Sequence, residues 1–203
     1  EVICCDESQV YLAKIESISN IVNLTIEKLL DYDNELKIQV TIAQGLVRRE
    51  KTEEVIRRLT ELGCYAYLPV TMRRSIVKAN PDKLERWYKI IKEASEQSQR
   101  NKLMMLKEPL AFNDFLKLAP QYDLCLYAHV SEDNNSFNKI INQFNGQKIL
   151  VLVGPEGGYD DTEIQTLETN GFKRISLGKR ILRTETAPLY IMSVLGYEFG
   201  DKK

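Results

Sequence analysis

The spacing of the apolar residues along the chain changes near residue 34. Before this point, residues 10–15 and 21–26 are short β-prone runs separated by serine and asparagine, a pattern that predicts a meander of strands. The segment is too short to close a barrel by itself. We therefore expect residues 1–33 to be the later part of a small β domain whose first strands precede Glu1, with the linker near residues 31–34.

From residue 37 onward, stretches of period two alternate with stretches of helical period. Ile38, Val40 and Ile42 alternate as in a strand, and the next apolar positions share one helical face that ends at Gly63. Further strands are expected at 66–70, 124–128, 149–153 and 174–177. Helices are expected after Asn80-Pro81, near 112–116, at 138–144, from a capping box at Asp160 and Glu163 to residue 170, and from Thr186. This alternation predicts an α/β domain over residues 34–203, with a parallel sheet covered on both faces.

Two of the expected buried strands end at glycine. The apolar run 149–153 stops at residues 154–158, Gly-Pro-Glu-Gly-Gly, and the run 175–177 stops at Gly178. Glycine lets the backbone adopt unusual dihedral angles and approach a ligand closely. Since open α/β sheets bind ligands at the carboxyl ends of their strands, we expect both turns to border one crevice. The sequence contains no Walker loop and no G-x-G-x-x-G fingerprint. A tight turn without a ligand remains the alternative interpretation.

Three polar or basic clusters are candidate binding surfaces. In the segment 177–186, Lys179, Arg180 and Arg183 could meet an anion, while leucine and isoleucine side chains could wall a slot for a flat ring. Polar residues also gather at 93–101, where amide and guanidinium groups could bind a base or a phosphate. Arg73 and Arg74, at another strand end, could extend that surface. A solvated loop or helix end is the alternative in each case.

Composition narrows the possible chemistry. The chain has 28 Lys and Arg against 29 Asp and Glu, so overall charge does not indicate nucleic-acid binding. Its four cysteines form no C-x-x-C pair and it has one histidine, His129, so no metal site is expected. We expect the cysteines to be buried reduced thiols in a cytoplasmic protein, and His129 to be structural. No apolar run approaches the ~20 residues that span a membrane.

Four short motifs, taken in chain order, resemble those of a known family. Residues 154–158 followed by 177–187 (LGKRILRTETA) closely resemble the RsmE-type ribosomal RNA methyltransferases of the SPOUT superfamily. Residues 93–100 (EASEQSQR) match a third signature of that family, and residues 60–63 (TELG) match a fourth. The resemblance covers about residues 36–197, which is most of the chain.

This resemblance implies a fold and an activity. It implies a parallel sheet with a C-terminal trefoil knot near residues 150–190, a PUA-like N-terminal β domain and a homodimer packed through the knot. It also implies S-adenosylmethionine as the cofactor and 16S rRNA of the 30S subunit as the substrate, methylated at N3 of a uridine. A SPOUT enzyme acting on tRNA and a non-catalytic knotted RNA-binding dimer are the alternatives.

The resemblance also assigns roles to individual residues. Arg183, Glu96 and Arg100 are the expected catalytic residues, and Arg73, Arg74, Gln97 and Arg100 the expected RNA-binding residues. A guanidinium such as that of Arg183 would stabilise the negative charge on a deprotonated uracil. The general base stays open between Glu96 and Glu185. The expected cofactor-binding residues are Leu152, Val153, Gly154, Glu156, Gly157, Gly158, Leu177, Gly178, Ile181, Leu182 and Thr184.

Overall fold

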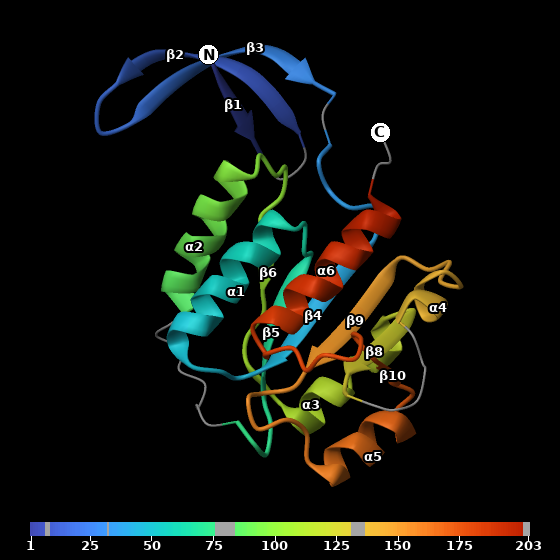
Figure 1. Ribbon diagram of the computed structural model, residues 1–203. Helices are drawn as coiled ribbons and strands as arrows, with labels where there is room; N and C mark the ends of the chain where they lie inside the picture. Colours follow the sequence, from blue (N-terminus) through green and yellow to red (C-terminus); the bar gives the residue numbers. More distant parts are fainter. Residues whose placement is uncertain (7–8, 32, 76–83, 131–136, 201–203) are drawn as a thin grey trace.

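The N-terminal residues form a small antiparallel sheet. The computed structural model describes residues 1–6, 9–31, 33–75, 84–130 and 137–200. Strands β1 (Val2–Cys5), β2 (Val10–Ile18) and β3 (Val22–Leu30) pair in that order, beside one end of the main domain (Figure 1). The predicted strand meander is thereby confirmed.

The main domain is built on a parallel sheet with the strand order β10-β8-β9-β4-β5-β6, and β7 also pairs with β5. The predicted parallel sheet is therefore confirmed. Its strands are β4 (Gln39–Gly45), β5 (Ala66–Thr71), β6 (Met105–Leu106), β7 (Leu110–Ala111), β8 (Leu124–Ala128), β9 (Lys148–Val153) and β10 (Lys173–Ile175).

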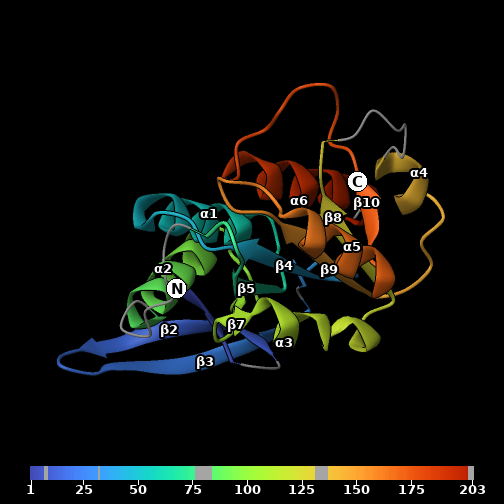
Figure 2. The same ribbon diagram turned by 90° about the horizontal axis from the view of Figure 1, so that it is seen from below.

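Helices cover both faces of this sheet, and alternate residues of β9 show why (Figures 1 and 2). Ile149, Val151 and Val153 belong to one apolar core, while Leu150 and Leu152 belong to the other. The first core also contains residues of α1 (Arg49–Glu61), α2 (Leu84–Gln97), α4 (Phe137–Ile141) and α6 (Thr186–Phe199). The second contains residues of α3 (Phe112–Leu116) and α5 (Asp161–Thr169). A strand buried on both faces is a continuous apolar run, as the sequence predicted.

Several element boundaries match the expected signals, and two do not. Asp160 and Glu163 form the predicted capping box of α5, and Gly63 follows α1 with a φ of 80°. The strand expected at 174–177 ends at Ile175, which pairs with Ala128, the last residue of β8. The helix expected to reach residue 144 ends at Ile141. The expected start at Asn80-Pro81 lies outside the described residues.

The prediction that the cysteines are buried is confirmed for Cys64 and Cys125 but not for Cys4 and Cys5. Cys64 and Cys125 are buried, and burial raises the pKa of the Cys64 thiol to about 12. Cys5 is exposed and Cys4 is half-buried, because β1 is an outer strand of the small sheet. Over the residues that the structure describes, no helix is long and apolar enough to cross a bilayer, and no group of three or more potential metal ligands occurs.

Candidate functional site

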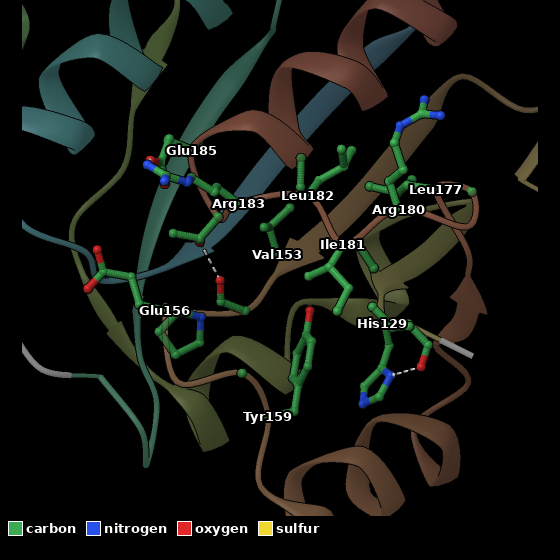
Figure 3. A pocket seen from close by; sticks show the side chains of 18 of the residues that line it. His129, Val153, Glu156, Tyr159, Leu177, Arg180, Ile181, Leu182, Arg183 and Glu185 are labelled. Carbon is green, nitrogen blue, oxygen red and sulfur yellow. Dashed lines mark hydrogen bonds and ion pairs between the residues drawn. The ribbon is translucent and has the colours of Figure 1, made fainter. Parts of the chain in front are cut away.

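A cavity of about 580 Å³ lies at the carboxyl ends of β8, β9 and β10. It is bordered by the turn after β9 (residues 154–159, hereafter the glycine turn) and by the segment between β10 and α6 (residues 177–185, hereafter the basic segment) (Figure 3). The two turns that the sequence singled out therefore face one crevice, as predicted. The lining residues are Lys51, Ala128, His129, Val130, Val153, Gly154, Pro155, Glu156, Gly158, Tyr159, Leu177, Gly178, Arg180, Ile181, Leu182, Arg183, Thr184, Glu185 and Ala187.

Glycines shape this cavity in two ways. A Cβ on Gly45, at the end of β4, would lie 2.5 Å from Cδ of Pro155, so the strand end packs directly against the glycine turn. Gly158 and Gly178 instead have φ values of 69° and 107°, and a Cβ on either would meet nothing within 4 Å. Gly45 allows the close packing of β4 against the glycine turn. Gly158 and Gly178 instead allow a left-handed backbone next to open space.

Hydrogen bonds join the two borders of the cavity. The Thr184 hydroxyl donates to the carbonyl oxygen of Gly154 at 2.6 Å, and the buried side-chain amide of Gln44 donates to the carbonyl oxygen of Thr184 at 2.8 Å. The Tyr67 hydroxyl donates in turn to the Gln44 side-chain oxygen at 2.9 Å. The basic segment is therefore tied both to the glycine turn and to the centre of the sheet.

Aromatic rings close the cavity beneath the glycine turn. The Tyr159 hydroxyl donates to the carbonyl oxygen of Leu152 at 2.9 Å, and burial raises its pKa well above the ordinary value. The His129 ring stacks on Tyr159 with centroids 5.7 Å apart, and its Nδ1 lies 2.6 Å from the Val130 carbonyl oxygen. These contacts hold His129 in the wall of the cavity, and its structural role stays a prediction.

The cavity has a charged end and an apolar end. Lys51, from α1, places Nζ 2.7 Å from Oε1 of Glu156 and 3.3 Å from Oε1 of Glu185. The hydrogen bond to Glu156 is the main reason why the pKa of Lys51 is raised. Figure 3 shows Glu156, Arg183 and Glu185 on one side of Val153, with Leu177 and Ile181 on the other, where Arg180 is the charged side chain. Such a site suits a ligand with one flat apolar part and one charged part.

Comparison with known proteins decides the family. Residues 34–196 match the RNA methyltransferase domain family. The ribosomal RNA small subunit methyltransferase E of Bacillus subtilis is 36% identical over 210 residues, which cover 98% of this chain and 82% of that protein. This chain belongs to that family. The relative from Synechocystis is 41% identical over 157 residues, covering 76% of this chain and 52% of that protein.

Two solved structures of similar proteins contain a cofactor. Ribosomal RNA small subunit methyltransferase E from Neisseria gonorrhoeae, bound to S-adenosyl methionine, has a TM-score of 0.88 at 29% identity, covering 96% of this chain and 81% of that one. A methyltransferase from Legionella pneumophila, in complex with the bound cofactor SAM, has a TM-score of 0.86 at 30% identity, covering 97% and 81%.

Most of the cofactor-binding residues expected for this family line the cavity. The exceptions are Leu152, which is buried under Tyr159, and Gly157, which backs onto Arg74. A Cβ on Gly157 would lie 3.0 Å from Cβ of Arg74. Arg183, one of the three expected catalytic residues, also lines the cavity, with an exposed side chain.

Arg73 and Arg74 lie against the outside of the glycine turn rather than in the cavity. The Arg73 guanidinium is 3.2 Å from a carboxylate oxygen of Asp160, and Arg74 donates to the carbonyl oxygen of Gly157 at 3.3 Å. Both residues are exposed. They remain candidates for RNA contact next to the cavity.

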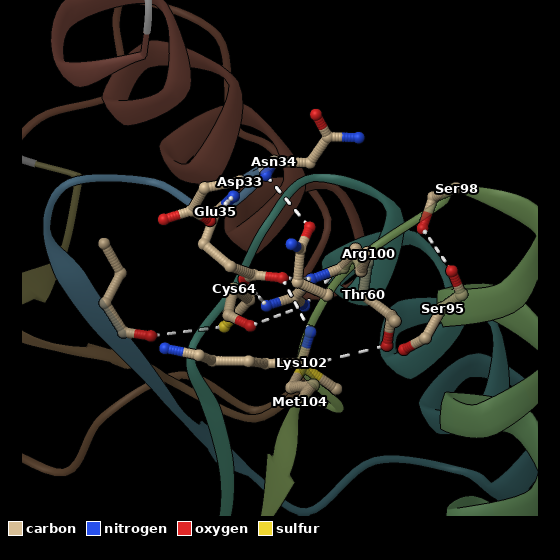
Figure 4. A network of polar contacts seen from close by, with 12 residues as sticks. Asp33, Asn34, Glu35, Thr60, Cys64, Ser95, Ser98, Arg100, Lys102 and Met104 are labelled. Atoms are coloured by element: carbon tan, nitrogen blue, oxygen red, sulfur yellow. Dashed lines mark hydrogen bonds and ion pairs between the residues drawn. The ribbon is translucent and has the colours of Figure 1, made fainter. Parts of the chain in front are cut away.

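Arg100 does not line the cavity but lies at the opposite end of the sheet. Figure 4 shows the network of polar contacts around it. Its guanidinium is buried, forms an ion pair with Glu35, and donates to the carbonyl oxygens of Thr60 at 3.2 Å and Cys64 at 2.9 Å. Glu35 precedes β4 and Cys64 precedes β5, whereas the cavity follows the other ends of the strands. The structure therefore gives Arg100 a packing role instead of bringing it to Arg183 as expected.

Glu96 and Gln97 are likewise not brought to the cavity. Both are exposed at the end of α2, where Oε1 of Glu96 lies 4.0 Å from Nζ of Lys92. Of the two candidate bases, Glu185 lines the cavity and Glu96 does not.

Sequence reasoning missed Lys51 and Tyr159 among the lining residues. Tyr159 directly follows the glycine turn, so an aromatic residue next to that motif was an available signal. Lys51 lies 105 residues before Glu156, and no local pattern connects the two. Its place depends on how α1 packs beside α6.

Proposed function

We propose that this chain methylates N3 of a uridine in 16S rRNA of the small ribosomal subunit, with S-adenosylmethionine as the methyl donor. The observation that carries the proposal is the meeting of the glycine turn and the basic segment around one cavity. The names of the relatives support rRNA of the small subunit as the substrate. The choice of uridine N3 rests on the family resemblance of the motifs.

The cavity residues fit this cofactor. Leu177, Ile181 and Leu182 offer an apolar wall for an adenine ring, and Gly158 and Gly178 leave space where a Cβ would otherwise project. At the charged end, Lys51 and Glu156 offer an ammonium and a carboxylate group to the amino-acid part of the cofactor. Glu156, Gly154 and Thr184 would complete the enclosure.

When bound, S-adenosylmethionine supplies an electrophilic methyl group on a positively charged sulfur. The residues of the chain then have three tasks. Binding in the cavity aligns the reacting atoms, which can supply much of the rate. Arg183 stabilises the negative charge that spreads over the uracil carbonyl oxygens when the N3 proton leaves. The pair Arg73 and Arg74, beside the cavity, holds the RNA backbone. Gln97, exposed at the end of α2, would contact the RNA at a separate place.

Two features of the assembly belong to the same proposal. We infer that the basic segment and α6 complete a trefoil knot, and that two copies pack through it; the exposed Tyr190 and Tyr197 on α6 support such a contact. We also infer that the N-terminal sheet belongs to a PUA-like RNA-binding domain. Its exposed apolar side chains suit the interior of a barrel; they include Ile3, Ile18, Ile21, Val22, Ile26 and Leu29. Its substrate places the enzyme in the cytoplasm.

Methyl transfer to defined RNAs tests the proposal. The protein is incubated with labelled S-adenosylmethionine and either undermethylated 30S subunits or unmodified tRNA, and the RNA is digested to nucleosides. We expect labelled 3-methyluridine from the 30S subunits only. Label in tRNA would favour the tRNA alternative. Cofactor binding without transfer to either RNA would favour a non-catalytic RNA-binding dimer.

A further inference from the structure

We propose that Glu185 is the general base that removes the N3 proton of the uridine, and that Lys51 positions its carboxylate. This inference rests on the proposed function, since it concerns the proton that must leave before N3 can be methylated. It chooses between the two carboxylates that the sequence left open.

The two oxygens of the Glu185 carboxylate have different surroundings. Oε1 lies 3.3 Å from Nζ of Lys51 and 3.9 Å from Nη1 of Arg183. Oε2 is buried and has no hydrogen-bond partner. Both cations therefore approach the same oxygen and leave Oε2 without a partner. Since Oε2 is covered, the carboxylate has to turn to bring it into the cavity that Glu185 lines.

A buried carboxylate oxygen without a partner is costly, and a ligand that donates a hydrogen bond would remove that cost. The donor we assign to it is the N3–H of the uracil. Arg183, which is placed to stabilise the uracil anion, precedes Glu185 by two residues, and its guanidinium lies beside the same carboxylate in Figure 3. The apolar end of the cavity, which suits the adenine, lies on the other side of Val153.

The proton transfer balances with groups that the site provides. The N3–H bond breaks, its proton forms an O–H bond at Oε2, and its electron pair stays on N3. That pair forms the new bond to the methyl carbon, and the pair of the broken carbon–sulfur bond stays on sulfur. Glu185 ends neutral and returns its proton to water after the product leaves.

Lys51 is the positioning residue of this arrangement. It comes from α1 and bridges Glu156 of the glycine turn and Glu185 at the start of α6. Its ammonium group and the guanidinium of Arg183 both lie near Oε1, so they fix the orientation of the Glu185 carboxylate.

The first test is Glu185→Gln, which keeps the shape of the side chain but removes the base. We expect kcat for 30S subunits to fall roughly 100-fold or more, with the affinity for S-adenosylmethionine and for the analogue sinefungin changed by less than about threefold by calorimetry. Glu54→Gln, which removes a carboxylate on the exposed side of α1, is the control. If cofactor affinity falls as far as kcat, Glu185 binds the cofactor and the assignment is overturned.

The second test uses the acidity of the substrate. The substrate is 30S subunits reconstituted with rRNA that contains 5-fluorouridine. The fluorine makes the N3–H more acidic, so the rate of methyl transfer depends less on a general base. The defect of Glu185→Gln should then shrink at least tenfold relative to the wild-type protein on the same RNA. An equal defect on both RNAs would overturn the role as base.

The third test concerns Lys51. Lys51→Met removes the cation that holds Oε1 of Glu185, so kcat should fall while the affinity for sinefungin stays unchanged, and Lys51→Arg should restore most of the lost kcat. A Lys51→Met protein with wild-type kcat would contradict the positioning role. If the wild-type protein transfers no methyl group to 30S subunits, the proposed function fails. If it does so and Glu185→Gln matches it, only this inference fails.

Discussion

The hydroxyl of Thr184 donates a 2.6 Å hydrogen bond to the carbonyl oxygen of Gly154, 30 residues earlier in the chain. This bond joins the two borders of the cavity at the place where β9 ends and α6 is about to begin. Because Gln44 also holds the backbone of Thr184, the basic segment is fixed before any ligand binds. The cavity is in this sense preorganised.

Thr184→Val should weaken cofactor binding, since it removes the hydroxyl and keeps the shape. Without this hydrogen bond, the two borders have to be brought together when the cofactor binds. The lost bond is worth about 1 kcal/mol, which raises Kd about fivefold. Calorimetric titration with S-adenosylmethionine measures the change. Thr166→Val, which removes a hydroxyl bonded within α5, is the matched control. Equal affinities for the Thr184 variant and the wild-type protein would contradict this role.

Gly178→Ala should lose cofactor affinity as well as stability. An alanine at a φ of 107° is strained by about 1–3 kcal/mol, and its Cβ would enter the open space of the cavity. Gly171→Ala, with a φ of 82° and equally open surroundings outside the cavity, should lose only stability. Thermal unfolding and calorimetry separate the two effects. The same affinity loss in both variants would show that strain alone is responsible.

Arg183→Ala should lower turnover by about 100–1000-fold, as the loss of a group that stabilises an oxyanion does. Cofactor affinity should stay nearly intact, because the Arg183 side chain is 82% exposed to solvent and not enclosed in the cavity wall. Single-turnover methylation of 30S subunits and calorimetry are the two measurements, with Arg58→Ala on the exposed face of α1 as the control. Parallel losses of turnover and affinity would contradict the role of Arg183.

Arg100→Met should destabilise the fold rather than act on catalysis directly. It leaves the Glu35 carboxylate without its partner and strips a donor from the carbonyl oxygens of Thr60 and Cys64. Breaking a buried ion pair costs about 3–5 kcal/mol, which urea unfolding can measure against Lys92→Met, a change in an exposed pair. Unchanged stability with lost turnover would return Arg100 to the RNA-facing role that the sequence suggested.

The sequence predicted those features of the site whose signals are local. The glycine turn, the basic segment and the capping box of α5 are each contained in a few consecutive residues, and each lies where its pattern predicted. The common crevice followed from one rule, that parallel strands gather their carboxyl ends at one edge of the sheet.

The features that the sequence did not predict depend on contacts between distant residues. Arg100 has the residue type of a phosphate ligand, yet Glu35, 65 residues earlier, neutralises it in the interior. Lys51 lies in a helix whose pattern indicates only a solvated face, and α1 carries it to two carboxylates more than 100 residues away. The positions of Arg100 and Lys51 both depend on how the helices pack on the sheet, and a local sequence pattern carries no information about that packing.

The central claim is that the cavity between the glycine turn and the basic segment holds the methyl donor. A crystal structure of the protein with sinefungin tests it most directly. The account predicts the adenine beside Leu177, Ile181 and Leu182 and the amino-acid part toward Lys51 and Glu156. Sinefungin bound elsewhere on the protein, with this cavity empty, would contradict it.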